Sequence, residues 1–479
     1  MRSAHTPFRA VVLLALTAAT AQAQALPGPP ESTMQSSSSA QAGPQLTLTL
    51  DSAVALALRV ATPVQQGQFS SAIAGTELTR GYGALLPSVS VGGARTVLTG
   101  NTLVGSRALV PWDTRFETMG YQLSTSLNLL GGLTAYPTIK SAEYTRNAYD
   151  LSLERTRQSV ALDVSEAYLQ TVLDSQLVAI ARQNSAVSQQ RVDQLQELVK
   201  VGKRAPADLY RSQAQASADE SAVYDAVNRQ RADQIALLQR LHIDPQRPVS
   251  LPAPALDTTN VDQRYLDTLA LVSEALQRRS DFQATQSEVD ATRWGIRRAS
   301  NEALPTLSVG FTLFSTGRVF DRALQDGVNQ ITTTQSPLAD QVGEQGTTIL
   351  SVGLGYNFFD LFRSRLDAQE ARVAYSSAEL TASDVQRQVA GDVARGISEY
   401  GVAVQRLAST ASGLASAQAA YDLVSGRFEV GFSSIVDLLT AQVALFQARS
   451  LRAQAVIQLS LAKRALAYAV GLTPTDSLR

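Results

Sequence analysis

The stretch LPSVSVG at residues 86–92 recurs as LPTLSVG at residues 304–310. Within each copy apolar residues alternate with small polar ones, and similar alternation appears in residues 121–129 and 350–358. A period of two is typical of a half-buried β-strand. A soluble β-sandwich would account for this pattern. However, the polar set is mainly Ser, Gly, Thr and Asn, without charges, which favours strands with a wet barrel interior on one side and lipid on the other.

The repetition covers most of the chain. Residues 128–131 (NLLG) correspond to residues 357–360 (NFFD), and Val201-Gly202 corresponds to Val430-Gly431 at the same separation. A one-residue slip would rotate the apolar face of a helix out of its packing. A register kept without gaps over such a length therefore indicates long continuous helices.

Two such helices are expected, at about residues 139–201 and 366–430. Alanine recurs in both segments, and small residues at helical spacing allow close helix–helix approach in a bundle or coiled coil. About sixty residues at 1.5 Å each reach about 90 Å. A globular domain does not need helices of this length, so we expect them to span a gap.

The N-terminus indicates secretion. Arg2 and Arg9 precede a short apolar run and a small-x-small cleavage pattern, which predicts a signal peptide. The run is too short to cross a bilayer as a helix. We predict a signal peptide (1–25), a flexible leader (26–45), a first helix–strand–strand–long helix–helix repeat (46–245), a connector (246–264), a second repeat (265–474) and a C-terminal tail (475–479).

Composition argues against catalysis. The chain has no cysteine and only two histidines, His5 and His242, so no cluster of metal ligands and no nucleophile–base pair can be assembled from them. The net charge of -1 lacks the basic footprint of a nucleic-acid binder. We expect no enzymatic activity, no cofactor, no metal site and no nucleic-acid partner.

The strand number points to an oligomer. Four strands cannot close a barrel, and open sheet edges are not tolerated in lipid. Copies of the chain would therefore share one barrel. The predicted fold is α+β: a homotrimer with a shared 12-stranded antiparallel transmembrane β-barrel, four strands per chain, continued by a long α-helical coiled-coil periplasmic barrel.

The chain resembles the TolC-like outer-membrane efflux proteins. The resemblance rests on the strand openings at Pro87 and Pro305, on NFFDLF at residues 357–362 and on VGFSSIVDLL at residues 430–439. It covers nearly everything from Leu46 to Leu472. The resemblance implies a trimeric channel-tunnel in the outer membrane of a Gram-negative bacterium, in contact with its lipid and extending into the periplasm. It also implies a periplasmic adaptor (membrane fusion protein) and an inner-membrane pump as partners.

The implied function is the exit duct of a tripartite efflux or type I secretion system that exports small molecules such as drugs. A periplasmic or surface coiled-coil structural protein, such as an adhesin stalk, is the alternative. It would explain the signal peptide and the helices but not the duplicated strand pairs. An enzyme ranks third.

The breaks after the long helices are the candidate functional sites. Glycine beside a helix end permits the left-handed backbone that stops a helix, and proline can begin the next one. Such breaks can be simple hairpin turns. The resemblance makes them the periplasmic tips that dock the adaptor, with these residues at the tips: Val201, Gly202, Lys203, Val430, Gly431 and Phe432.

The resemblance also implies a gate. Asp208 and Asp437 are the candidate acidic constriction, although an aspartate in a first helical turn is often a helix-capping residue. The family's second aspartate, its gate tyrosine and its gate arginine are replaced by Thr440, Phe428 and Ser433. We expect Lys203, Arg204, Arg427 and Glu429 to supply substitute ion pairs near the mouth, each contributing about 0–1 kcal/mol.

Overall fold

A computed structural model describes residues 46–104, 110–129, 132–255, 267–325, 328–329 and 335–473. The expected signal peptide, leader and C-terminal tail lie outside these residues. One compact unit begins at Leu46. It is mainly helical with one long sheet, so the α+β prediction is confirmed.

Both halves of the unit have the same order of long elements, two helices, two strands and two helices. In the first half they are α2 (Leu50–Val60), α3 (Thr62–Gly83), β2 (Ser88–Val104), β3 (Val110–Asn128), α4 (Gly132–Lys200) and α5 (Pro206–Arg240). In the second half they are α6 (Thr268–Arg278), α7 (Ser280–Asn301), β5 (Thr306–Gln325), β7 (Thr347–Gly355), α9 (Arg363–Glu429) and α10 (Ile435–Val470). Two further elements, β6 (Val328–Asn329) and α8 (Leu338–Glu344), lie between β5 and β7.

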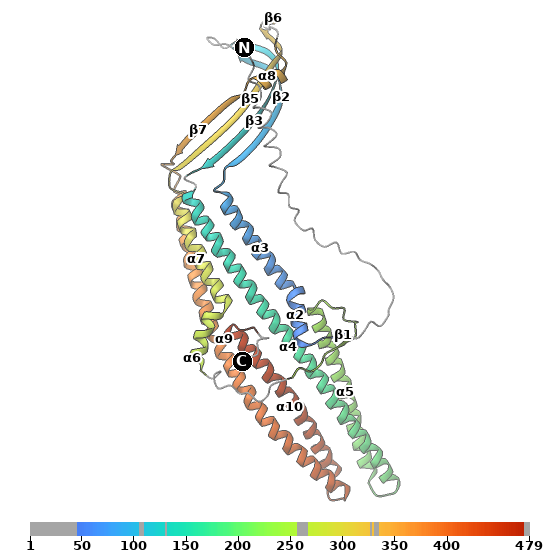
Figure 1. Cartoon of the computed structure of the whole chain (residues 1–479). Coiled ribbons are helices and arrows are strands. Elements are labelled where there is room, and N and C mark those ends of the chain that lie inside the picture. Colours follow the sequence, from blue (N-terminus) through green and yellow to red (C-terminus); the bar gives the residue numbers. More distant parts are fainter. Residues whose placement is uncertain are drawn as a thin grey trace. The chain divides into compact units, whose positions relative to one another are not determined.

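The four long strands form one antiparallel sheet at the end of the unit opposite the helical tips (Figure 1). Their order is β2-β3-β5-β7, so the two halves meet where β3 pairs with β5. The β2–β3 pairing keeps one register from Ser88 opposite Ser126 to Val104 opposite Val110. The outer strands β2 and β7 each have one neighbouring strand among the described residues.

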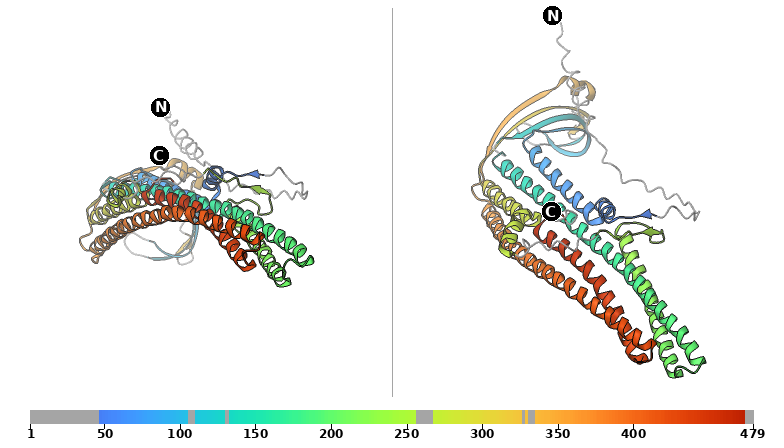
Figure 2. Two further views of the ribbon diagram at one scale, coloured as in Figure 1. Left: turned by 90° about the horizontal axis from the view of Figure 1, so that it is seen from below. Right: turned by 60° about the horizontal axis from the view of Figure 1, so that its bottom comes forward.

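The long helices extend further than the sequence predicted. α4 has 69 residues and α9 has 67, which corresponds to about 100 Å each at 1.5 Å per residue. α4 packs against α5, and α9 packs against α10, giving two helical hairpins. α10 also packs against α4, which brings the hairpins side by side (Figure 2).

The short helices before the strands are broken, although the sequence predicted a single helix in each half. Ala61 (φ -61°, ψ 126°) separates α2 from α3, and Arg279 (φ -67°, ψ 116°) separates α6 from α7. Both residues have extended backbone, which interrupts the helical hydrogen bonds. Pro63 explains the first break because proline has no N–H to continue the helical hydrogen bonds of α2, and it is tolerated in the first turn of α3.

The first repeat is tied to the connector that follows it. β1 (Leu46–Thr47) pairs in parallel with β4 (Val249–Ser250). The buried hydroxyl of Tyr168 lies 2.6 Å from the carbonyl oxygen of Pro252 and 3.0 Å from that of Leu48. These contacts close a hydrophobic cluster that also contains Val164 and Leu237.

Two helix ends carry corresponding positive-φ residues. His242 follows α5 with φ 53°, and Gly471 caps α10 with φ 91°. His242 and Gly471 are separated by the same number of residues as Gly202 and Gly431, so they occupy corresponding positions in the two halves. His242 thus occupies a helix-ending position, which gives it a structural role.

Candidate functional site

The two helical tips share one turn geometry. Gly202 and Gly431 have φ of 71° and 86°, in the left-handed region that glycine adopts without strain. The Lys203 N–H donates to the Leu198 carbonyl at 2.8 Å, and the Phe432 N–H donates to the Arg427 carbonyl at 2.8 Å. A second bond runs from each glycine N–H to the carbonyl three residues earlier. This pair of bonds is the Schellman motif, which satisfies carbonyls left unpaired at a helix end.

The tips differ in how the second helix begins. Ser434 caps α10: its hydroxyl oxygen accepts the Asp437 N–H at 3.1 Å. In return, a carboxylate oxygen of Asp437 accepts the Ser434 N–H at 3.1 Å and the Ser434 hydroxyl at 2.7 Å. This reciprocal pair is a capping box. The hydrogen bonds from Ser434 hold the pKa of Asp437 below its ordinary value.

The first tip has no such cap. Ala205 occupies the cap position of α5 and has no side-chain oxygen, while Pro206 opens the helix. Asp208 stands in the first turn, at the position that corresponds to Asp437. Both aspartates therefore lie where a carboxylate complements the positive end of a helix.

A cation from the first tip caps the helix that ends in the second. The guanidinium of Arg204 donates a 2.6 Å hydrogen bond to the Phe428 carbonyl and lies 4.2 Å from the centroid of the Phe428 ring. Phe428 is buried with Leu195, Ile435 and Leu438 from both hairpins. Because Phe428 lies in the last turn of α9, the positive charge of Arg204 also complements the negative end of that helix.

The expected substitute ion pairs are not seen within the chain. Among the described residues no carboxylate lies within ion-pairing distance of Lys203, Arg204 or Arg427. Arg204 uses a carbonyl and an aromatic ring in their place. Arg427 is exposed, Ser433 is half-buried, and the hydroxyl of the exposed Thr440 donates to the Val436 carbonyl at 2.8 Å.

Large apolar side chains are exposed at both tips. Val201, Val430 and Phe432 are 65%, 68% and 82% exposed. Such exposure in the middle of a polar turn marks a surface available to another protein.

One interhelical contact near the tips was missed by the sequence analysis. The amide of Gln442 on α10 donates to Ser188 on α4 at 2.6 Å, and the hydroxyl of Ser188 donates to Asp219 on α5. All three side chains are buried. A glutamine at an otherwise apolar position of α10 was the available signal, but its partners are too distant in the sequence to be identified from spacing.

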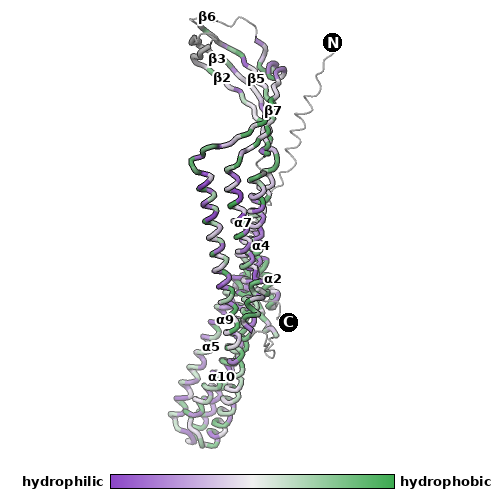
Figure 3. Tube along the Cα trace, turned by 90° about the vertical axis from the view of Figure 1, so that its left-hand side faces the viewer, coloured by the Kyte–Doolittle hydropathy of each residue, from purple (hydrophilic) through white to green (hydrophobic). Residues whose placement is uncertain are grey.

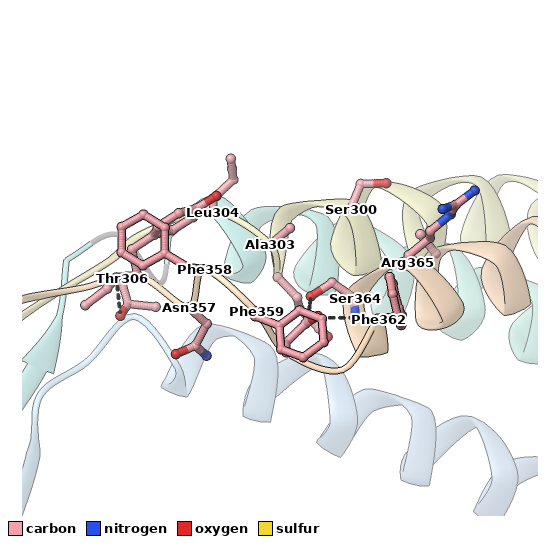
Figure 4. A pocket seen from close by; sticks show the side chains of 15 residues that line it. Ser300, Ala303, Leu304, Thr306, Asn357, Phe358, Phe359, Phe362, Ser364 and Arg365 are labelled. Atoms are coloured by element: carbon pink, nitrogen blue, oxygen red, sulfur yellow. Dashed lines mark hydrogen bonds between the residues drawn. The ribbon is translucent and has the colours of Figure 1, made fainter.

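A pocket lies where β7 leads into α9. It has a volume of about 590 Å³ and is lined by Phe358, Phe359 and Phe362 together with polar side chains (Figure 4). Phe362 has φ 66°, and the N–H of Ser364 donates to the Asp360 carboxylate at 2.9 Å, which secures the turn. This turn is the NFFDLF motif.

The described helices contain no stretch that is both long and apolar enough to be a membrane span. Figure 3 shows hydrophilic and hydrophobic positions interleaved along them.

Comparison with known proteins finds a family match in the second half of the chain. Residues 271–472 match the family model described as "Outer membrane efflux protein". The chain is 24% identical over 362 residues to the outer membrane efflux protein BepC of Brucella suis biovar 1 (strain 1330), covering 75% of this chain and 73% of the relative.

The chain is thus similar to the outer membrane efflux protein family. Its resemblance to TolC-like proteins, noted from the sequence, is thereby confirmed. The predicted location, in the outer membrane of a Gram-negative bacterium and extending into the periplasm, is confirmed by these matches.

Solved structures share the fold of this chain. A membrane protein from Pseudomonas aeruginosa has a TM-score of 0.73 at 16% identity, covering 88% of this chain and 90% of that one. The outer membrane protein VceC from Vibrio cholerae has a TM-score of 0.70 at 14% identity, covering 88% and 96%. At these identities the likeness concerns the fold alone.

Proposed function

We propose that three copies of this chain form a non-enzymatic channel-tunnel that serves as the exit duct of a tripartite efflux or type I secretion system. Small molecules such as drugs would leave through it. Each copy would contribute four strands to a 12-stranded barrel, and the long helices would continue the channel through the periplasm.

The open edges of the sheet are the observation that carries this proposal. β2 and β7 each have one strand neighbour among the described residues, and several of their side chains are highly exposed, including Val91 (73%) and Val352 (68%). Backbone groups on an open edge need a partner in lipid. The β2 edge of one copy and the β7 edge of the next would satisfy each other, which closes the ring.

The tips support a partner at the other end. We propose that Val201, Gly202, Lys203, Val430, Gly431 and Phe432 dock the periplasmic adaptor, which connects the tunnel to an inner-membrane pump. Asp208 and Asp437, with Thr440 and Ser433 nearby, would form the polar surroundings of the mouth. Arg204, held against Phe428, would keep the two tips of each chain together, while Arg427 is exposed.

Cysteine cross-linking tests the shared barrel directly, because the chain has no native cysteine. Cysteines are introduced in pairs, one at Val89 or Val91 on β2 and one at Val352 or Leu354 on β7, and the protein is oxidised in outer membranes. We expect a covalent trimer on a denaturing gel for at least one pair, and no trimer for the single-cysteine controls.

A second measurement does not depend on whether the introduced cysteines lie opposite each other in neighbouring copies. The mass of the protein in mild detergent should correspond to three mature chains. A detergent-bound monomer would contradict the shared barrel. A protein that needs no detergent would favour the coiled-coil stalk.

A further inference from the structure

Two carboxyl groups meet between α4 and α5, away from the tips and from the sheet. Asp174 on α4 is 4% exposed. One of its carboxyl oxygens accepts a 3.3 Å hydrogen bond from the Gln170 amide, while the other has no N–H or hydroxyl donor among the described residues. Hydrogen bonds on either side, Arg240 to Asp163 and Ser188 to Asp219, fix the antiparallel register of α5 on α4. In that register Asp233 on α5 faces Asp174, within hydrogen-bonding reach. Two adjacent carboxyls without a donor between them favour keeping one proton.

The positive charge of Arg229 favours the ionised form of Asp174, but burial and Asp233 outweigh it. Asp174 lines a pocket of about 260 Å³ with Phe446, Ser450 and Gln454 of α10, none of which is charged. On α5 the pocket is lined by Asp225, which adds negative charge, and by Arg229, which is not within ion-pairing distance of Asp174 among the described residues. On α4 the adjacent polar group is the neutral Gln170.

We propose that Asp174 holds a proton that it donates to the Asp233 carboxylate, and that losing this proton loosens the packing of α5 on α4. With the proton, one carboxyl donates to the other across the interface. Without it, two negative charges face each other in a largely buried site, where like charges repel strongly. The helical hairpin that carries the first tip thereby becomes sensitive to pH.

The direction of the pH effect follows from the protonation of Asp174. Burial is the main cause that raises its pKa, with Asp233 adding to it, to about 7. In an opened hairpin the pKa would return to about 3.9, the ordinary value for aspartate. The closed hairpin then binds a proton that the open one releases. Its extra stability is complete below about pH 4 and is lost as pH rises to about 7.

Hydrogen–deuterium exchange of the full-length protein in detergent measures this opening. After correction for the intrinsic pH dependence of exchange, the opening equilibrium of the α5 segment around Asp233 should rise by up to tenfold per pH unit between pH 5 and 7, the limit for one proton. It should level off above pH 7. An opening equilibrium that does not change with pH would overturn the proposal.

Three variants test whether the proton on Asp174 causes the pH dependence of opening. Asp174→Asn should remove the pH dependence, because an amide does not titrate in this range. Asp225→Asn, an exposed carboxyl of the same pocket, should behave like the wild type. Asp233→Asn removes the like charge, so the pH at which the rise levels off should move down. This last shift decides the matter if Asp174→Asn does not fold, and its absence would contradict the proposal.

The proposal does not depend on the exit-duct function. The exchange measurement reads the α4–α5 interface in any oligomeric state, so failure of the trimer in cross-linking would leave this result unaffected.

Discussion

At the break between α6 and α7, Arg279 is buried and forms ion pairs with Asp281 at 2.6 Å and Asp392 at 3.0 Å. At the corresponding break between α2 and α3, Ala61 is buried beside Val64 and Leu153, without any charge. The backbone is extended in both places. One bend of the chain is therefore stabilised by an ion pair in one repeat and by apolar packing in the other.

The two tips likewise share a backbone geometry but differ in their side chains. Both end their first helix with a left-handed glycine, but only the second tip begins its next helix with a serine cap. The duplicated halves thus retain backbone geometry more strictly than side-chain chemistry. This difference can be tested by making the chemistry of one half resemble that of the other.

The largest effect is expected at the buried arginine. Arg279→Ala should lower the free energy of unfolding by about 3 kcal/mol, since removing the buried arginine leaves two half-buried carboxylates without this partner. Breaking a buried ion pair typically costs about 3–5 kcal/mol. The expected loss lies at the lower end because Arg155 still faces Asp281 at 3.5 Å and Arg395 still pairs with Asp392. Denaturant unfolding of the detergent-solubilised protein measures the loss.

A matched variant sharpens this comparison. Arg279→Ala with Asp281→Pro places alanine and proline where the first repeat has Ala61 and Pro63. It also removes one of the carboxylates that lose their partner when Arg279 is replaced. It should be more stable than Arg279→Ala alone. Equal stability of the two variants, or a loss below about 0.5 kcal/mol for the single change, would mean that the ion pairs do not stabilise the second break.

The network also predicts an acid limit. Burial raises the pKa of Asp281, but the hydrogen bonds and positive charges of Arg279 and Arg155 outweigh burial and lower it below the ordinary value. Its stabilisation is therefore present above about pH 4 and is lost as pH falls further. The variant with Asp281→Pro should lack this contribution to the acid limit.

An intermediate effect is expected where the tips touch. Arg204→Ala removes the hydrogen bond to the Phe428 carbonyl and the contact with its ring, and should cost about 1–2 kcal/mol. Arg427→Ala is the matched control, because the exposed side chain of Arg427 has no hydrogen bond, ion pair or ring contact among the described residues. In a planar bilayer, Arg204→Ala should also increase the mean conductance. Identical behaviour of the two variants would argue against a closing role for Arg204.

The smallest effect is expected from exchanging the caps. Ser434→Ala should cost about 1 kcal/mol of local stability, and Ala205→Ser, which places a serine three residues before Asp208, should gain about 0.5 kcal/mol. Hydrogen exchange in the first turns of α10 and α5 reports each change. If Ala205→Ser protects α5 no better than a conservative Lys203→Arg change, the missing cap is not what distinguishes the tips.

Much of the fold was predictable because it depends on periodicity. Alternation gave the four long strands, and the gapless repeat gave the long helices and the positions of Gly202 and Gly431. The helix breaks were missed at Ala61 and Arg279 because extended backbone at one residue leaves no period to detect. Pro63 and Asp281 occupy corresponding positions in the two halves. The proline at one of these positions was the signal that could have indicated the breaks.

The candidate site was predicted less completely. The residues of both tips were identified from turn chemistry, and the capping alternative considered for Asp437 is what the structure shows within the chain. The sequence analysis expected ion pairs for Arg204, whereas Arg204 contacts the carbonyl and the ring of Phe428. Such contacts join residues far apart in sequence, as do Asp174 with Asp233 and Ser188 with Gln442, and no local pattern specifies them.

The pairing of β1 with β4 has a consequence for the order in which the chain matures during export. The two strands lie at opposite ends of the first repeat, so they can pair only after that whole repeat has left the secretion machinery. Tyr168, between the carbonyls of Leu48 and Pro252, acquires its second neighbour at the same moment. The first repeat can thus close before the second has been delivered, and a nascent chain halted before Val249 lacks that closure.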